Sequence, residues 1–314
     1  MARKSIRSAK IDNSPIKILD KKGLDYVINP LGRKPNESEL AKMISDFDMV
    51  IAGTEHYSDY VMGQGKQLKF ISRVGIGLDG IDLSAAHRRG IKVSYTPDAP
   101  TPAVAELTIG FIFSLLRSLH ISNIKMHNSE WQKISGRSLR KSTIGIIGLG
   151  PIGQEVLRLI SALGCKNILL NDVRDHLKLD DSPTIQWQSK DYIFREADII
   201  TLHVPLTSAT KNMIDRNALE LMKPNALLIN TARGSIINEQ DLFDVLKSGH
   251  LGGAAIDVFV SEPLDKSSPL INAKNILLTP HLGASTFEAK ESVSNSVCKQ
   301  MIEYFKENKL SNPL

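Results

Sequence analysis

The feature that most constrains the fold is a repeated alternation of short apolar runs with segments of helical periodicity. The runs are rich in Ile, Val and Leu, and they are continuously apolar rather than alternating in polarity. Continuous runs are typical of parallel strands that helices cover on both faces. The sequence therefore predicts an α/β protein with doubly wound parallel sheets, Rossmann-like or flavodoxin-like in type.

Two series of such runs indicate two domains, as expected for 314 residues when a typical domain has ~100–150. The first series of expected strands comprises residues 16–19, 26–28, 49–52, 70–74 and 91–94. The second series comprises residues 144–147, 168–171, 199–203, 226–230, 254–258 and 276–279. An apolar helix at 101–119 links the two series, and a long amphipathic helix at 287–308 ends the chain. We expect this last helix to dock onto the first domain.

Composition argues against two classes of partner. The longest uncharged apolar run, residues 107–116, is much shorter than the ~20 residues that cross a bilayer. The net charge is +5, with 39 Lys and Arg against 34 Asp and Glu. These charges are interspersed and aromatic residues are scarce, so only net charge argues for nucleic-acid binding. We therefore expect neither nucleic acid nor a membrane as a partner, and the mild positive charge suits a small anionic substrate.

The N-terminus and the cysteines favour a cytoplasmic protein without a metal. The basic start MARKSIRSAKID lacks the apolar core of a secretory signal. We interpret it as a frayed tail before the first strand, with a transit peptide as the alternative. Cys165 and Cys298 lie far apart and outside any CxxC pattern, which suits a reducing compartment. His120 and His127 belong to no His/Cys cluster, so we expect no metal site.

A glycine motif opens the second series. Gly148, Gly150 and Gly153 have the G-x-G-x-x-G spacing directly after an expected strand. Such glycines permit a tight turn, the approach of a pyrophosphate and close helix packing, and the helix N-terminus attracts the phosphates. Asp172 ends the next strand, where a carboxylate suits the ribose hydroxyls of NAD and repels the 2′-phosphate of NADP. The motif predicts NAD as the cofactor, although Arg174 nearby argues against strict selectivity.

Polar residues also follow the later strands of this series, where parallel sheets bind ligands. Arg233 offers a bidentate guanidinium for a carboxylate, and His281 is a proton carrier whose ordinary pKa lies near neutral pH. Glu262 could hold the imidazole of His281 and favour its protonated form. With a nicotinamide, this set indicates interconversion of 2-hydroxy and 2-oxo acids. Taken singly, Arg233 could instead cap a turn, Glu262 could lie in a solvated loop, and His281 could be a satisfied buried imidazole.

The chain resembles the D-2-hydroxyacid dehydrogenase family. The segments GLGPIG, LHVPLT, NTARG, DVFVSEP and TPHLGAST carry the resemblance, which runs from about residue 72 to residue 288. TPHLGAST with Glu288-Ala289, and SRVGIGLDGIDL in the first series, look closest to the phosphoglycerate dehydrogenase branch. The chain resembles the short form of that branch, without the regulatory domain, so serine control through such a domain is not expected.

The resemblance implies roles for individual residues. Arg233 would bind the substrate carboxylate and carbonyl, His281 would be the acid/base, and Glu262 would be its partner. The residues implied in substrate binding are Arg73 and the backbone amides of Gly75, Ile76 and Gly77. The residues expected to bind the cofactor are Gly148, Gly150, Pro151, Ile152, Gly153, Asp172, His203, Val204, Pro205, Thr207, Thr231, Ala232, Arg233, Asp257, His281 and Gly283.

We expect residues 1–118 plus 286–314 to form a discontinuous substrate-binding domain and residues 119–285 the NAD-binding Rossmann domain. The active site would lie in the cleft between them, with hinges near residues 119 and 285. Family members are usually dimers, mostly through the cofactor domain, so the resemblance also implies a homodimer.

Substrate identity is the least determined feature. Gly80 stands where the family usually has Asn or His, and Tyr95 stands where it often has Asn. Pro151 replaces a common Arg of the glycine loop. The first two lie on the substrate side. We expect an NAD-dependent 3-phosphoglycerate dehydrogenase. Hydroxypyruvate or glyoxylate reduction is the alternative within the same chemistry, and an NAD(H)-sensing, corepressor-like protein without turnover is the alternative of another class.

Overall fold

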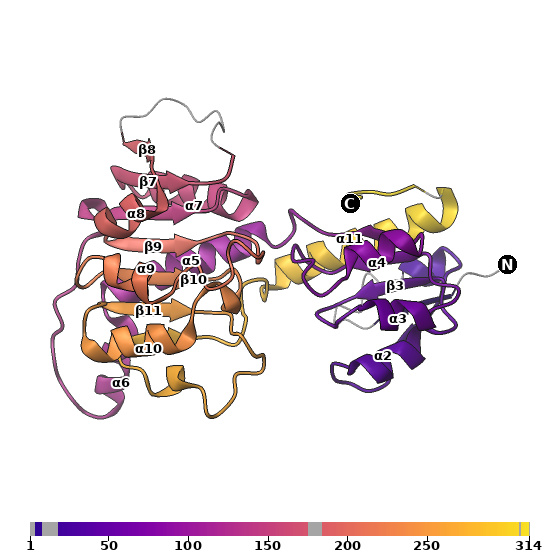
Figure 1. The fold of residues 1–314 in the computed structure, drawn as a ribbon, viewed down its shortest axis with the longest axis horizontal. Coiled ribbons are helices and arrows are strands. Elements are labelled where there is room, and N and C mark those ends of the chain that lie inside the picture. Colours follow the sequence, from indigo (N-terminus) through magenta and orange to yellow (C-terminus); the bar gives the residue numbers. More distant parts are fainter. Residues whose placement is uncertain (1–3, 8–17, 175–183, 308, 314) are drawn as a thin grey trace. The chain divides into compact units, whose positions relative to one another are not determined.

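The computed structural model describes residues 4–7, 18–174, 184–307 and 309–313, and the chain divides into two compact units (Figure 1). The first unit comprises residues 1–100 and 284–314, and the second comprises residues 101–283. The division thus lies earlier in the chain than the expected boundary at residue 118. Helix α5 (Thr101–Leu116) explains the difference, because its residues Phe111, Ile112 and Leu115 pack in the same apolar cluster as α7 (Pro151–Ala162).

The first unit contains a parallel sheet in the order β2-β1-β3-β4-β5, which is the flavodoxin-like order. Its strands are β1 (Lys4–Arg7), β2 (Asp25–Ile28), β3 (Met49–Ala52), β4 (Phe70–Arg73) and β5 (Lys92–Ser94). Its helices include α2 (Glu37–Ile44), α3 (Asp59–Gln64), α4 (Leu83–Arg88) and α11 (Phe287–Glu307). Strand β3 has apolar residues on both faces: Val50 packs toward α2 and α3, and Met49 packs toward α11. This explains why the sequence pattern there is continuous.

The first strand differs from the expectation. Residues 18–21 are helical instead of belonging to a strand at 16–19, and residues 16 and 17 lie outside the described residues. The strand is β1, within the basic segment that we interpreted as a frayed tail. Its backbone pairs with β2 on one side and β3 on the other. Both partners lie far along the chain, so the local composition of KSIR does not reveal the pairing.

The second unit contains a parallel sheet in the order β12-β11-β10-β9-β6-β7-β8, which is a Rossmann order with one added strand. Its strands are β6 (Thr143–Ile147), β7 (Asn167–Asn171), β8 (Ile185–Trp187), β9 (Ile199–Leu202), β10 (Leu227–Asn230), β11 (Gly253–Ile256) and β12 (Ile276–Leu278). Its other helices are α6 (Leu119–His127), α8 (Lys190–Glu196), α9 (Arg216–Leu221) and α10 (Glu239–Ser248), with short 3₁₀ turns at Leu139–Lys141, Gly234–Ile236 and Pro269–Asn272. The expected helix at 101–119 thus ends at Leu116.

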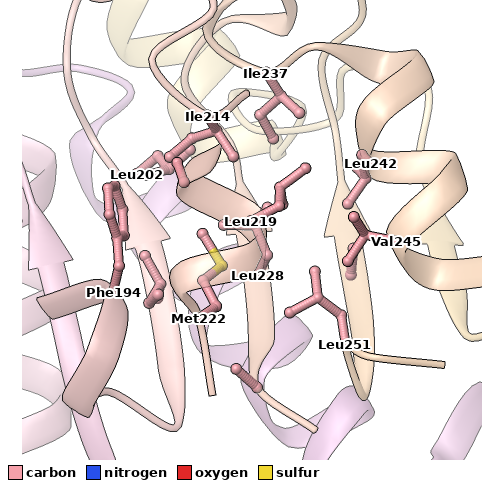
Figure 2. Close-up of a cluster of buried hydrophobic side chains, with 14 of the residues drawn as sticks. Phe194, Leu202, Ile214, Leu219, Met222, Leu228, Ile237, Leu242, Val245 and Leu251 are labelled. Carbon is pink, nitrogen blue, oxygen red and sulfur yellow. The ribbon is translucent and has the colours of Figure 1, made fainter. Parts of the chain in front are cut away.

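Helices cover both faces of this second sheet. On one face, Leu202 and Leu228 pack against Phe194 of α8, Leu219 of α9 and Leu242 of α10 (Figure 2). A separate apolar cluster on the other face joins the sheet to α5 and α7. Within the described ranges no single helix has the length and apolar character to cross a membrane, although α5 and α6 satisfy that test jointly with a bend of 64° between them.

Candidate functional site

The glycine loop follows β6 and leads into α7, at the point where the strand order of the second sheet reverses. Gly148 has a φ of +98°, and a Cβ there would lie 2.5 Å from the carbonyl oxygen of His203. A Cβ on Gly153 would lie 2.0 Å from the carbonyl oxygen of Gly148. These two positions therefore require glycine, one for the turn and one for packing of the helix.

Gly150 differs from the other two glycines, because a Cβ there would meet no atom within 4 Å. It caps the N-terminus of α7 without a side-chain hydrogen bond, and Pro151 follows within the first turn. The open space and the uncapped amides of this turn, which includes Ile152, suit a pyrophosphate. The loop thus fits the phosphates of a dinucleotide.

Asp172 lies beside this loop and is ionised. Its carboxylate accepts hydrogen bonds from the N–H of Leu149 at 2.6 Å and the N–H of Arg174 at 2.9 Å. The Arg174 guanidinium also donates to it, at 3.1 Å. Burial favours the neutral carboxyl, but these hydrogen bonds outweigh it and lower the pKa of Asp172. Because Arg174 is engaged by Asp172, the pair suits NAD better than the 2′-phosphate of NADP.

His203 is neutral and lies against the glycine loop. Burial lowers its pKa to about 3, and its Nε2 lies 2.9 Å from the hydroxyl of Thr201. A Cβ on Gly148 would also meet the side chain of Val204 at 2.9 Å. The start of the expected segment 203–207 therefore borders the loop, whereas Pro205 and Thr207 are exposed farther along it.

The loop after β10 presents Arg233. Asn230 is fully buried and closes the loop: its Oδ1 accepts the N–H of Ala232 at 3.0 Å, and its Nδ2 donates to the carbonyl of Arg233 at 2.9 Å. Thr231 is buried, with its hydroxyl 3.2 Å from that of Thr108. Asn230 lies in the NTARG segment, but its role in closing the loop was not predicted from the sequence.

Gly234 brings this loop against the one that follows β11. A Cβ on Gly234 would lie 2.0 Å from the carbonyl carbon of Phe259, so the two backbones are in direct contact. The contact places Arg233 close enough for its positive charge to help lower the pKa of Glu262. The structure therefore brings Arg233 and Glu262 together, as expected.

Glu262 and His281 form the pair that the sequence predicted. The Nδ1 of His281 lies 2.8 Å from one carboxylate oxygen of Glu262, and the other oxygen accepts the N–H of Phe259 at 3.1 Å. Burial favours the neutral acid, but the hydrogen bonds from His281 and Phe259 outweigh it, so the pKa of Glu262 is lowered. An ionised carboxylate only accepts, so Nδ1 carries a proton and Nε2 is left for a substrate.

A pocket of about 450 Å³ lies against this pair. Its lining residues are Phe259, Glu262, Pro263, Leu264, Leu278, Thr279, Pro280 and His281. The imidazole is partly exposed, with 43% of the side chain accessible. Proton transfer with a small molecule is therefore sterically feasible at His281.

Asp257 holds the turn that carries His281. Its buried carboxylate accepts hydrogen bonds from the Thr279 hydroxyl at 2.5 Å, the Leu282 N–H at 2.7 Å and the Gly283 N–H at 2.8 Å. His281 has a φ of +53°, which a non-glycine residue adopts only when its surroundings hold it there. Asp257 thus fixes the turn that carries His281, and its expected role at the cofactor stays a prediction.

The expected substrate residues lie at the end of β4 and in the loop that follows it in the first unit. The Arg73 guanidinium donates to the carbonyl of Gly77 at 2.9 Å, and the Thr96 hydroxyl accepts the N–H of Gly75 at 2.7 Å. The amide of Gly75 is therefore engaged internally and differs from the expectation of a free donor. In the part of the chain that the structure describes, no hydrogen bond engages the N–H of Ile76 or Gly77.

A buried polar network supports this loop from α11. The Gln300 side-chain oxygen accepts hydrogen bonds from the Ser72 and Ser94 hydroxyls at 2.6 and 2.8 Å. Its side-chain amide nitrogen Nε2 donates to the carbonyl of Tyr95 at 2.8 Å. The network joins the ends of β4 and β5, and it was not predicted from the sequence.

The structure also explains Gly80, a departure from the family pattern, since a Cβ there would lie 2.8 Å from the carbonyl oxygen of Glu55.

Comparison with protein families and curated proteins agrees with these features. Residues 109–283 match the family described as D-isomer specific 2-hydroxyacid dehydrogenase, NAD binding domain. The chain is 37% identical over 273 residues to a hydroxypyruvate reductase of Thermotoga maritima, covering 85% of this chain and 88% of that protein. It is 33% identical over 315 residues to a glyoxylate reductase of Thermofilum pendens, covering 98% and 93%.

It is also 38% identical over 291 residues to a D-3-phosphoglycerate dehydrogenase of Methanocaldococcus jannaschii, covering 91% of this chain but only 54% of that protein. Among solved structures, a Thermus thermophilus protein superposes with a TM-score of 0.91 at 28% identity, covering 99% of both chains. An NADPH-dependent glyoxylate/hydroxypyruvate reductase from Sinorhizobium meliloti superposes with a TM-score of 0.89 at 25% identity, covering 100% of this chain and 97% of that one.

Proposed function

Because the chain belongs to the D-isomer specific 2-hydroxyacid dehydrogenase family, an NAD(P)-dependent oxidoreductase family acting on CH–OH groups, we propose that it interconverts 3-phosphoglycerate and 3-phosphohydroxypyruvate with NAD. The observation that carries the proposal is the contact between Glu262 and His281, with Arg233 on the adjoining loop. These residues supply the proton carrier and the carboxylate ligand that this reaction requires.

The glycine loop and Asp172 would hold NAD, which would supply the hydride acceptor for oxidation at C2 of the hydroxy acid and, when reduced, the hydride donor for the oxo acid. In reduction, Nε2 of His281 gives its proton to the oxygen on C2, and in oxidation it takes that proton back. Glu262 stabilises the imidazolium and fixes the ring through Nδ1. Arg233 binds the substrate carboxylate. We propose that the first unit binds the same carboxylate through the backbone amides of Ile76 and Gly77 and through Arg73.

The SRVGIGLDGIDL and TPHLGAST segments support 3-phosphoglycerate as the substrate. Hydroxypyruvate or glyoxylate is the second candidate, and coverage favours it: the chain matches 88% and 93% of those two relatives, against 54% of the phosphoglycerate dehydrogenase. NAD is proposed over NADP because Asp172 is ionised and engages Arg174.

The test is oxidation of NADH, and in parallel NADPH, with phosphohydroxypyruvate, hydroxypyruvate, glyoxylate and pyruvate. The proposal expects the largest kcat/KM for phosphohydroxypyruvate with NADH. A larger value for hydroxypyruvate or glyoxylate would establish the second candidate. Tight NADH binding without turnover of any of the four would overturn both and favour an NAD(H)-sensing protein.

We also propose a homodimer formed through the second unit. Helix α6 buries no residue, and its neighbourhood exposes Leu119, Ile124, Met126 and Trp131. Ile124→Glu combined with Trp131→Glu should convert the dimer to a monomer in sedimentation velocity. Ile271→Glu, which changes another exposed apolar residue of this unit, should not. A cytoplasmic location is proposed as well, consistent with Cys165 and Cys298 being buried cysteines outside a disulfide.

A further inference from the structure

A second pocket of the second unit, of about 670 Å³, lies apart from the site described above. Its lining residues are Phe113, Arg117, Ile134, Ser135, Gly136, Arg137, Ser138, Leu139, Arg140 and Leu163. The residues of the proposed active site follow the carboxyl ends of the strands. In contrast, Arg140 precedes β6, and Arg137 bonds to Asn225, which precedes β10. The pocket therefore lies at the opposite edge of the sheet, and we name it the arginine pocket.

Three guanidinium groups line the arginine pocket. Arg137 donates from Nη2 to the carbonyl of Asn225 at 2.9 Å, and Arg140 donates from Nε to the carbonyl of Leu163 at 3.3 Å. Each guanidinium has five N–H donors, so both keep donors for a ligand while a backbone carbonyl holds them. Across the described residues, none of the three, Arg117 included, forms an ion pair with a carboxylate, and the lining contains no Asp or Glu.

The segment that carries Arg137 is built against the end of α5. A Cβ on Gly136 would lie 2.5 Å from the carbonyl oxygen of Leu116, and the N–H of Arg137 donates to that same oxygen at 2.9 Å. This close approach places Arg137 beside Arg117, which directly follows α5. The backbone contact thus fixes the position of Arg137 relative to the end of α5.

A purely structural role accounts for only part of this arrangement. A basic side chain near the C-terminus of a helix stabilises the helix, and Arg140 at the end of α7 has that role. One arginine per helix end is enough for this effect, however, and three like charges around one pocket repel one another. An anion that bridges the guanidinium groups would relieve the repulsion.

We propose that the arginine pocket binds a phosphate-bearing organic anion with at least two negative charges, independently of NAD. Guanidinium forks match phosphate oxygens, and the hydroxyls of Ser135 and Ser138 add donors. Phe113, Ile134 and Leu163 provide apolar surface for the organic part of the ligand. The volume is within the ~300–1,000 Å³ that is usual for small-molecule sites.

The test is calorimetric titration of pyrophosphate into the enzyme saturated with NADH, so that the glycine loop is already occupied. The wild type should bind pyrophosphate, and R117Q combined with R140Q should weaken that binding by about tenfold or more, since charge-assisted hydrogen bonds are lost. R158Q removes one positive charge from an arginine that α7 exposes and that pairs with Glu155, and it should leave the binding unchanged.

Circular dichroism and the melting temperature establish that the variants fold, and R117Q alone serves if the double variant does not. Absence of pyrophosphate binding to the NADH-saturated wild type would overturn the proposal. Equal binding by the double variant would overturn it too. If the double variant instead changes the sedimentation coefficient and the wild type does not bind pyrophosphate, the pocket is a contact between copies of the chain and the proposal is wrong.

Discussion

The two units position their site residues by different means. In the second unit, carboxylates position the histidine: Asp257 holds the turn that carries His281, and Glu262 holds its imidazole, while the neutral Asn230 closes the loop of Arg233. In the first unit the positioning groups are neutral, because Gln300 joins β4 to β5 through two serine hydroxyls and one backbone carbonyl. A carboxylate that loses its donors is left as an uncompensated charge, whereas a neutral group leaves an unmade hydrogen bond.

This difference leads us to expect that substitutions in the two units will affect different kinetic constants. The proposed chemistry depends on charges whose geometry is fixed from several sides, so we expect substitutions in the second unit to act on kcat. The first unit should respond with smaller changes that appear in KM. Four substitutions, taken in order of expected effect, compare the units directly.

His281→Gln should lower kcat by about 10²–10⁴-fold, because glutamine keeps a polar side chain but cannot transfer the proton. The dissociation constant of NADH, measured by fluorescence titration, should change little. His250→Gln is the matched control, since His250 bonds to the Met222 carbonyl of the same unit. Undiminished turnover of the first variant would remove His281 from the mechanism.

Arg233→Lys should reduce kcat/KM for the oxo acid by roughly 10–100-fold, because an ammonium cannot form the bidentate contact of a guanidinium. Steady-state kinetics at saturating NADH measure this effect. Arg216→Lys, which changes an arginine bonded to Asp244 at 2.5 Å, should leave the kinetics intact. Unchanged kinetics of the Arg233 variant would reject its role as carboxylate ligand.

Gln300→Met should raise the KM for the oxo acid several-fold and leave kcat nearly unchanged. The Ser72 and Ser94 hydroxyls would lose their acceptor, which should also reduce the free energy of unfolding by about 1–3 kcal/mol. Met301→Leu, a buried apolar exchange on the same helix, controls for packing. A loss of stability with no change in KM would show that Gln300 is structural only.

His203→Gln tests a pH effect in the second unit. With a pKa near 6.5 in the unfolded chain and about 3 in the fold, the imidazole binds a proton only after unfolding between these values. The free energy of unfolding should therefore fall as pH decreases from 6.5 toward 3, and the variant should lose this part of the slope. His87→Gln, at an exposed position, should keep it. Urea titrations at several pH values measure the slopes, and identical slopes for wild type and His203→Gln would contradict this account.

Local signals explain how much of the fold was predictable. The cap at Asn238 and the left-handed Gly249 bound α10, and both signals are properties of the segment itself, so such helix ends can be predicted from the sequence. Strand β8 was missed, since it has three residues and is only partly buried. Strand β1 was missed because its pairing partners lie elsewhere in the chain.

The candidate site shows the same limit. The glycine spacing, Glu262 and His281 follow from motif and strand order, and the structure joins the latter two at 2.8 Å. The network of Gln300 could not be found in this way, because it connects residues 228 positions apart in the sequence. Asp257 was recognised as a site residue, but its partners in the turn at 279–283 appear only once the chain is folded.

The close approach at Gly234 has a practical consequence for anyone who wishes to change the substrate range. Phe259 lies against the α-carbon of Gly234. The loop that carries Arg233 therefore cannot be lengthened, tilted or given a side chain at Gly234 without displacing the loop that carries Glu262. Libraries aimed at new acids should leave residues 230–234 untouched. They should instead vary the side chains of residues 76 and 95 in the first unit.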